Sequence, residues 1–82
     1  MRYEYDEEKN RKNKEKHGVE FWQAAEVFED PYRIEAYDQA HSSLEEERWQ
    51  VIGKTKESKT LFVVFTEKIE GSIRLVSASV GC

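Results

Sequence analysis

Residues 47–78 decide the fold, and they read ERWQVIGKTKESKTLFVVFTEKIEGSIRLVSA. At the centre lies the apolar run 61–65, LFVVF, which is typical of a central β-strand covered on both faces. A strand is expected before it over residues 47–54 and another after it over 73–76, with polar turns at 56–58 and 70–71 between them. Connections this short join antiparallel neighbours, so these three segments predict consecutive hairpins.

The segment upstream of this stretch adds a fourth strand. Residues 32–37 alternate apolar and polar side chains, which predicts a half-buried strand, and the polar residues 38–46 predict a loop. Gly53, inside the expected strand 47–54, indicates a bulge or a close approach of another backbone.

Two helices are expected in the first third of the chain. Asp6 is a candidate N-cap and Gly18 a candidate stop, with acidic residues in the first turn and basic residues in the last, which predicts a helix over 7–17. An amphipathic pattern predicts a second helix over 20–29, ended by Pro31. The predicted class is α+β, with a short N-terminal strand, two helices on one face, and a four-stranded antiparallel meander.

The helix expected over 7–17 contains no apolar side chain. Helices in proteins gain most of their stability by packing an apolar face, so this one must dock through polar contacts and lysine stems or be ordered by a partner. A cationic helix without a core-facing stripe is therefore available for binding.

Length and composition favour one small domain over residues 1–82. No stretch approaches the roughly 20 apolar residues that a membrane span requires, and the N-terminus has no apolar signal core. The single cysteine, Cys82, cannot form an intramolecular disulfide. These features predict a cytoplasmic protein without a membrane partner.

The net charge of −4 is unevenly distributed. Residues 9–17 sum to +4 and residues 48–82 to +3, whereas residues 1–8 sum to −3 and residues 18–47 to −8. Cationic groups that share one face bind nucleic acid even in an acidic protein, because local potential decides within a Debye length of about 8–10 Å. The alternative is an ordinary charged surface with a solvated helix.

Several short motifs then occur in a specific order. Tyr3-Glu4-Tyr5-Asp6 is followed by Lys16-His17-Gly18-Val19, by Val27-Phe28-Glu29-Asp30-Pro31, by Glu47-Arg48-Trp49, and by Ile73-Arg74-Leu75-Val76-Ser77-Ala78. In this order the chain resembles the BrnT family of type II toxins, ribonucleases with a RelE-like fold. The resemblance covers residues 3–78. In the family the Ser-Ala pair precedes an arginine-rich segment, whereas Ala78 is followed here by SVGC; Lys12 also stands where relatives often carry an apolar residue.

The resemblance implies metal-independent cleavage of messenger RNA, in which the 2′-hydroxyl of the substrate is the nucleophile. The protein must then supply a base, an acid and cations for the phosphate. The candidates are Arg48 and Arg74 for the phosphate, with Glu47 and His17 for proton transfer. The alternatives are surface arginines paired with glutamates, and for His17 a helix-capping role.

Two lysines of the first helix, Lys14 and Lys16, are candidate RNA-binding residues, with a solvated helix end as the alternative. His41 lies in the polar loop and is a further candidate for the site. The spacing of histidine and cysteine predicts no metal site, and no cofactor-binding motif is found.

The resemblance also implies a partner, a cognate BrnA-like antitoxin of the ribbon-helix-helix class, and an oligomer formed with it. A second hypothesis is a catalytically inactive remnant that keeps the fold and the binding of antitoxin or nucleic acid. A third is a general nucleic-acid-binding module that uses the basic helix, for which the salt dependence of binding is the discriminating measurement.

Overall fold

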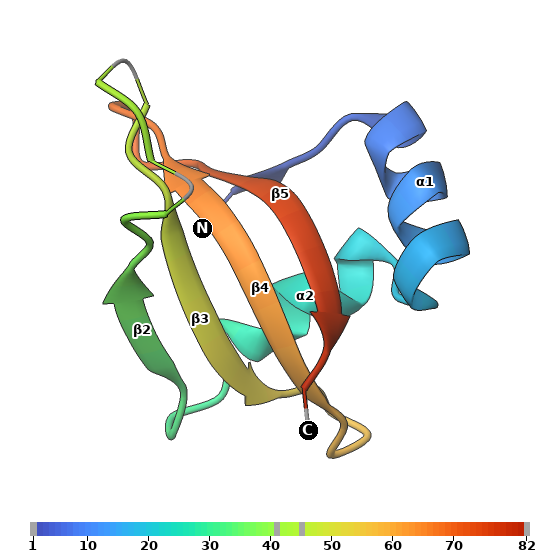
Figure 1. Cartoon of the computed structure of the whole chain (residues 1–82). Helices are drawn as coiled ribbons and strands as arrows, with labels where there is room; N and C mark the ends of the chain where they lie inside the picture. The colour runs from blue at the N-terminus through green and yellow to red at the C-terminus, as the bar shows by residue number, and fades with distance from the viewer. Residues whose placement is uncertain (1, 41, 45, 82) are drawn as a thin grey trace.

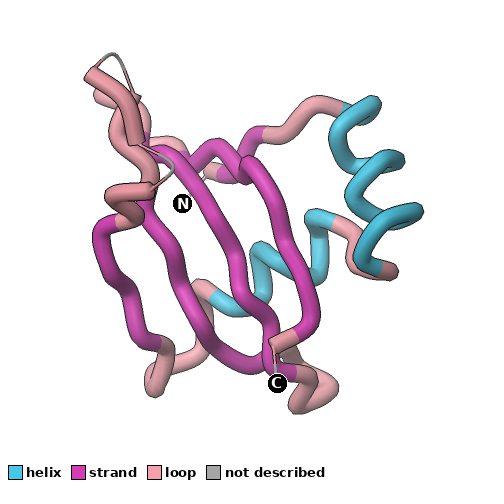
Figure 2. The backbone as a smooth tube through the Cα atoms, viewed as in Figure 1, coloured by secondary structure: helices cyan, strands magenta, loops and turns pink. Residues whose placement is uncertain are grey.

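The computed structural model describes residues 2–40, 42–44 and 46–81. Figures 1 and 2 show a curved sheet with one helix behind it and a second helix beside it. The elements in chain order are β1 (Tyr3–Glu4), α1 (Glu7–His17), α2 (Phe21–Val27), β2 (Ile34–Tyr37), β3 (Trp49–Lys54), β4 (Thr60–Glu67) and β5 (Ile73–Val80).

The five strands form one mixed sheet in the order β1-β5-β4-β3-β2. Strands β2 to β5 are antiparallel neighbours, as the hairpin turns predicted, and β4 is central. The expected four-stranded meander is present, but it is only part of the sheet. A fifth strand, β1, joins the sheet parallel to β5, with Tyr3 beside Ile73. The sequence pattern indicated this opening strand but not its neighbour, because a parallel pairing across two helices has no local signal.

Helix α1 begins and ends where its sequence predicts. The Asp6 carboxylate accepts a hydrogen bond from the Glu8 N–H (2.8 Å), and Gly18 adopts a left-handed conformation (φ 70°) while its N–H bonds to the Lys14 carbonyl (2.8 Å). These two residues satisfy backbone groups that a helix end leaves free.

Helix α2 supplies the helical side of the core. Its side chains Phe21, Ala24 and Val27 are fully buried against β3, β4 and β5. A side chain of α2 packs directly on Gly53 of β3, where an added Cβ atom would lie 2.8 Å from Val27 Cγ1. Gly53 pairs regularly with Leu61, and the group that crowds it is a side chain, so neither the expected bulge nor a neighbouring backbone explains this glycine. A larger residue there would force the helix away from the sheet.

Helix α1 lies along the edge of β5 rather than on the face of the sheet with α2 (Figure 1), which corrects the expectation of two helices on one face. The buried amide of Asn13 holds it there: Nδ2 donates to the Ala78 carbonyl (2.8 Å) and the Val19 carbonyl (2.9 Å), and Oδ1 accepts from the Ala78 N–H (3.1 Å). The Asn13 side chain thus bonds to both the N–H and the carbonyl of Ala78, as a neighbouring strand would do, at a part of β5 that β1 does not reach. The polar docking expected of an all-polar helix is confirmed.

Strand β2 is exposed along its whole length, although its alternating sequence predicted half-burial. It is the edge strand of the sheet, and α2 packs behind β3, β4 and β5. An alternating pattern reports two chemically different faces, but not whether the apolar face is covered.

None of the helices in the described part of the chain is long and apolar enough to cross a membrane. Cys82, which carried the expectation about disulfides, lies outside the described residues.

Candidate RNA-binding groove

The face of the sheet turned away from α2, here called the open face, brings two of the expected site residues together. Arg74 of β5 is the sheet neighbour of Thr66 in β4, and Arg48 directly precedes Trp49, the neighbour of Phe65. Side chains alternate along a strand, so Arg48, Thr66 and Arg74 share the open face. Two strand spacings separate the arginines, a backbone distance of about 10 Å.

Arg48 is held by contacts from its own loop. The Ser42 hydroxyl accepts a hydrogen bond from the Arg48 N–H (2.9 Å) and donates to the Asp38 carbonyl (2.7 Å). The guanidinium Nε lies 3.0 Å from the Glu46 carboxylate. One edge of the guanidinium is therefore occupied by Glu46, and the pair is solvent-accessible, so the attraction is weak enough for a phosphate to compete.

A groove of about 340 Å³ separates α1 from the open face, and several cationic side chains line it. Its lining consists of Lys9, Lys12, Asn13, Lys16, His17, Arg48, Val76 and Ser77. The three lysines are spaced by three and four residues, which places them on one flank of the helix. No carboxylate lines this groove in the part of the chain that the structure describes.

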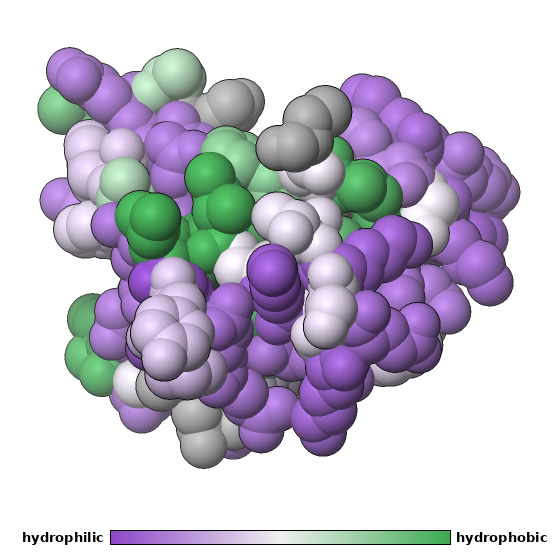
Figure 3. Space-filling model, turned by 90° about the horizontal axis from the view of Figure 1, so that it is seen from below, coloured by the Kyte–Doolittle hydropathy of each residue, from purple (hydrophilic) through white to green (hydrophobic). Residues whose placement is uncertain are grey.

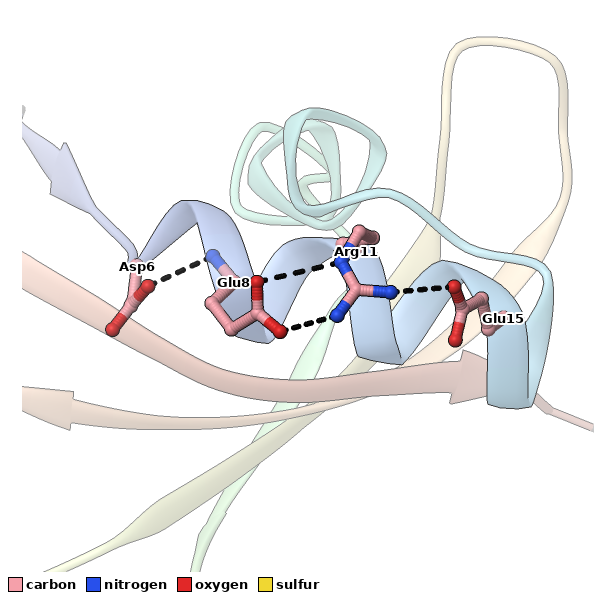
Figure 4. A network of polar contacts seen from close by, with 4 residues as sticks. All are labelled: Asp6, Glu8, Arg11 and Glu15. Atoms are coloured by element: carbon pink, nitrogen blue, oxygen red, sulfur yellow. Dashed lines mark hydrogen bonds and ion pairs between the residues drawn. The ribbon is translucent and has the colours of Figure 1, made fainter.

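On the outward face of α1, by contrast, positive and negative side chains of the helix pair with each other. Figure 4 shows Arg11 between Glu8 and Glu15, with an Arg11–Glu15 distance of 2.8 Å. The hydrogen bond from Arg11 lowers the pKa of the Glu8 carboxyl, and that bond in turn raises the pKa of Arg11. Among the described residues no carboxylate pairs with the groove lysines, so the free positive charge of α1 is concentrated on the flank that faces Arg48.

Three expected residues do not line the groove, namely Lys14, Glu47 and Arg74. Lys14 is on the opposite flank of α1, with Nζ 3.9 Å from the Glu20 carboxylate. Glu47 lines a different hollow, which has a volume of about 570 Å³ and also includes Glu46, Glu67 and Lys68. The candidate His41 lies outside the described residues.

Arg74 lies next to a carboxylate of β1. It is the parallel neighbour of Glu4, whose pKa is lowered chiefly by the hydrogen bond from the Ser72 hydroxyl (2.8 Å) and further by the charges of Arg2, Lys68 and Arg74. Arg74 therefore lies on the open face beside a carboxylate and does not line the groove, whereas Arg48 lines it together with the lysines.

His17 is partly buried at the C-terminal end of α1 and lines the groove. The helix ends at Gly18, whose N–H donates to the Lys14 carbonyl. Among the described residues no hydrogen bond to the His17 imidazole is found. His17 thus lies at the helix terminus and lines the groove with the lysines, and its role stays a prediction.

Sequence reasoning missed Lys9 and Lys12 as groove residues. Their signal was the 9-12-16 spacing, which marks one helix flank and excludes Lys14. In the sequence, Lys12 stands out only as a departure from an apolar family position. A lysine there extends the cationic flank towards Arg48.

A groove with four lysine and arginine side chains, a histidine and no lining carboxylate is suited to a polyanion. Among the described residues no group of three His, Cys, Asp or Glu side chains could hold a metal ion. Fold and groove together define a small α+β protein with a cationic groove between a helix and the open face of its sheet.

Comparison with known proteins identifies the family. The family described as ribonuclease toxin, BrnT, of type II toxin–antitoxin systems matches residues 5–79, and the chain belongs to it. The crystal structure of the Brucella abortus ribonuclease toxin BrnT superimposes with a TM-score of 0.71 over all of this chain and 97% of that chain, at 18% sequence identity. A search of the curated proteins gives no match. The family resemblance drawn from the motifs is confirmed.

Proposed function

We propose that this toxin is a metal-independent endoribonuclease of messenger RNA that holds its substrate in the groove between α1 and the open face. The cationic lining of that groove, unpaired on the lysine flank, is the observation that carries the proposal. Lysines spaced along one helix flank follow a phosphodiester backbone as point charges.

The chemistry divides among residues of the groove and of the neighbouring open face. The 2′-hydroxyl of the RNA attacks the adjacent phosphorus, its proton leaves to a base, and a second proton is given to the departing 5′-oxygen. Arg48 and Arg74 flank Thr66 on the open face and stabilise the charge that develops on the phosphate oxygens. His17 is the proton-transfer group inside the groove, and Glu47, which lines the neighbouring hollow, is the alternative base.

Membership of a type II toxin family supports an antitoxin partner. We propose that the toxin acts in the cytoplasm and is neutralised by a cognate BrnA-like antitoxin of the ribbon-helix-helix class, in an oligomer of both proteins. A RelE-like fold belongs to the same proposal. Strands β2 to β5 form the expected antiparallel meander, whereas β1 adds a parallel strand and α1 lies at the edge of β5.

The test is cleavage of a fluorescent oligoribonucleotide by the purified protein in the presence of a metal chelator. We expect cleavage to persist with the chelator and to fall about 100- to 1,000-fold in Arg48→Ala and Arg74→Ala, because each removes a donor to the developing phosphate charge. An oligonucleotide with a single 2′-deoxy position at the cleaved bond should remain intact.

Lys54→Ala is the matched control, since this exposed cation belongs to the opposite end of β3. Cleavage that survives both arginine substitutions would remove these residues from the mechanism. A wild-type protein that binds RNA in the groove without cleaving it would instead favour the catalytically inactive alternative.

A further inference from the structure

The open face carries regular rows of side chains that run across the sheet. In β3, Val51 is fully buried and Val27 of α2 crowds Gly53, so these two residues face α2 and the alternate residues Gln50 and Ile52 face away from it. The strand register then defines two rows beyond the one that holds the arginines. The middle row is Ala36–Gln50–Val64–Ser77. The outer row is Ile34–Ile52–Phe62–Ser79. Consecutive rows are about 7 Å apart, which is two residues along a strand.

The two rows differ in chemistry from the groove beside them. All eight of their residues lie in the described ranges, and none is charged. The outer row is apolar on three strands: Ile34 is 69% exposed, Ile52 is 41% exposed, and Phe62 is half-buried. Figure 3, which views the molecule from below, shows hydrophobic residues in one patch with hydrophilic ones around it. The open face thus offers an accessible aromatic ring among aliphatic neighbours.

The side chain of Gln50 provides the amide of the middle row. Its neighbours on either side, Ala36 and Val64, carry no polar group in their side chains. Among the described residues no hydrogen bond to the Gln50 amide is found. No polar side-chain atom of these residues is buried without a partner, so the amide reaches solvent. Gln50 lies two residues from Arg48 on the same side of β3, and the amide therefore stands beside the row that holds the arginines.

The rows and the groove are continuous. Arg48 and Ser77 line the groove, and Ser77 also ends the middle row. A ligand in the groove therefore has the lysine flank of α1 on one side and the uncharged rows on the other. Single-stranded nucleic acid has two sides that match, because its phosphates and its unpaired bases can face opposite directions. A duplex turns its phosphates outward and keeps its bases stacked, so it offers no base face to these rows.

We infer that the two uncharged rows bind the bases of single-stranded RNA. The inference rests on the proposed function, which places the RNA backbone in the groove. The Gln50 amide bonds to the edge of the base beside the phosphate that Arg48 holds, and the Phe62 ring stacks on the next base. A glutamine amide both donates to and accepts from adenine, so adenine is the favoured base beside Gln50.

The contribution of the bases is measured with strands that the protein cannot cleave. Strands with 2′-O-methyl groups lack the attacking hydroxyl, and fluorescence anisotropy gives their affinities. The probes are oligoadenylate, an abasic strand with the same number of phosphates, and a duplex of the same length. We expect oligoadenylate to bind about tenfold more tightly than the abasic strand, because stacked bases add to the phosphate contacts.

The variant Phe62→Leu keeps an apolar side chain and removes the aromatic ring. We expect the affinity for oligoadenylate to fall about tenfold. The affinities for the abasic strand and the duplex should stay unchanged, since neither presents an unstacked base. Trp22→Leu, which removes an exposed ring from α2 on the other side of the sheet, is the matched control. Urea unfolding of each variant verifies that the chain stays folded.

The variant Gln50→Glu tests the reading of the base. A carboxylate has the shape of the amide but only accepts hydrogen bonds, so it suits the amino group of cytosine. We expect the wild-type protein to prefer oligoadenylate to oligocytidylate about tenfold, and the variant to reverse this preference. The added negative charge weakens the binding of both strands, so the ratio of the two affinities is the readout. Gln39→Glu, in the exposed loop after β2, adds the same charge away from the rows.

The abasic strand separates this inference from the proposed function. If that strand binds in a salt-dependent way and Lys12→Ala weakens it, the groove holds a phosphate backbone whatever the bases do. If oligoadenylate then binds no better, or if Phe62→Leu changes no affinity, the inference is overturned and the apolar row is left for a protein contact. An unchanged base preference in Gln50→Glu overturns the role of Gln50. A protein that binds none of the three probes overturns both proposals.

Discussion

Lys12 and Lys14 are two residues apart on α1 yet face opposite sides of the helix. Lys12 lines the groove opposite Arg48, and Lys14 approaches Glu20. The two lysines therefore form a matched pair for separating local charge in the groove from the total charge of the protein.

We expect Lys12→Ala and Lys16→Ala each to weaken binding of single-stranded RNA and to lower the slope of log K against log salt by about 1, because each removes one phosphate contact. Lys14→Ala makes the same change in net charge and should leave the slope unchanged. Fluorescence anisotropy titrations at several salt concentrations measure both. Equal losses of affinity in the three variants would mean that RNA binding depends on the net charge of the protein and not on the groove.

At the scale of elements, the docking of α1 depends on one buried amide. Asn13 makes three hydrogen bonds to backbone groups of Val19 and Ala78, and it is the buried residue of α1. Its side chain therefore fixes both the edge of β5 and the flank of α1 that carries the lysines.

We expect Asn13→Ala to lower the free energy of unfolding by about 2–4 kcal/mol, since three buried backbone groups lose their partner. Asn13→Asp should cost at least as much, because its oxygen cannot donate to the two carbonyls. Urea unfolding followed by tryptophan fluorescence gives both values, with Asn10→Ala, which breaks one part-buried bond to the Phe21 N–H, as the comparison. A loss of less than about 1 kcal/mol for Asn13→Ala would contradict this role.

The elements themselves follow from local sequence signals. Asp6 and Gly18 set the ends of α1, the run 61–65 became the central strand, and Gly53 marks the contact between α2 and β3. Each of these positions acts through its own backbone or nearest neighbours, which is why a sequence pattern detects it.

The relative positions of distant elements could not be predicted from local sequence signals. The parallel pairing of β1, the position of α1 at the edge of β5 and the exposure of β2 all depend on contacts between residues far apart in the sequence. The same holds for the site: the family motifs indicated Arg48 and Arg74, but which α1 lysines face Arg48 depends on how Asn13 orients the helix.

At the scale of the whole molecule, Asp30 connects the turn after α2 to the end of β3. Its carboxylate accepts hydrogen bonds from the Tyr32 N–H (2.9 Å) and the Lys54 N–H (2.8 Å). These two backbone bonds lower the pKa of Asp30. A lowered pKa in the folded state means that the carboxylate stabilises the fold above the unfolded pKa of about 3.9, and that this contribution is lost as the pH falls through the folded value.

We therefore expect the free energy of unfolding to fall between about pH 4 and pH 2, and to fall less steeply in Asp30→Asn. The variant should be less stable than the wild type at pH 6 and approach it at pH 2, because an amide has one acceptor oxygen and does not ionise in this range. Chemical unfolding at a series of pH values measures both curves. Parallel curves for the two proteins would exclude a contribution from Asp30.

The absence of apolar side chains from α1 has a consequence for how this helix separates from the sheet. Detachment of α1 breaks hydrogen bonds but uncovers little apolar surface, and the denaturant dependence of an opening reaction scales with the surface that it exposes. In native-state hydrogen exchange, the amides of α1 should therefore exchange with a nearly flat dependence on urea, whereas those of β4 follow the steep dependence of global unfolding. The helix that carries the lysines is then a separate cooperative unit, able to leave and rejoin a sheet that stays folded.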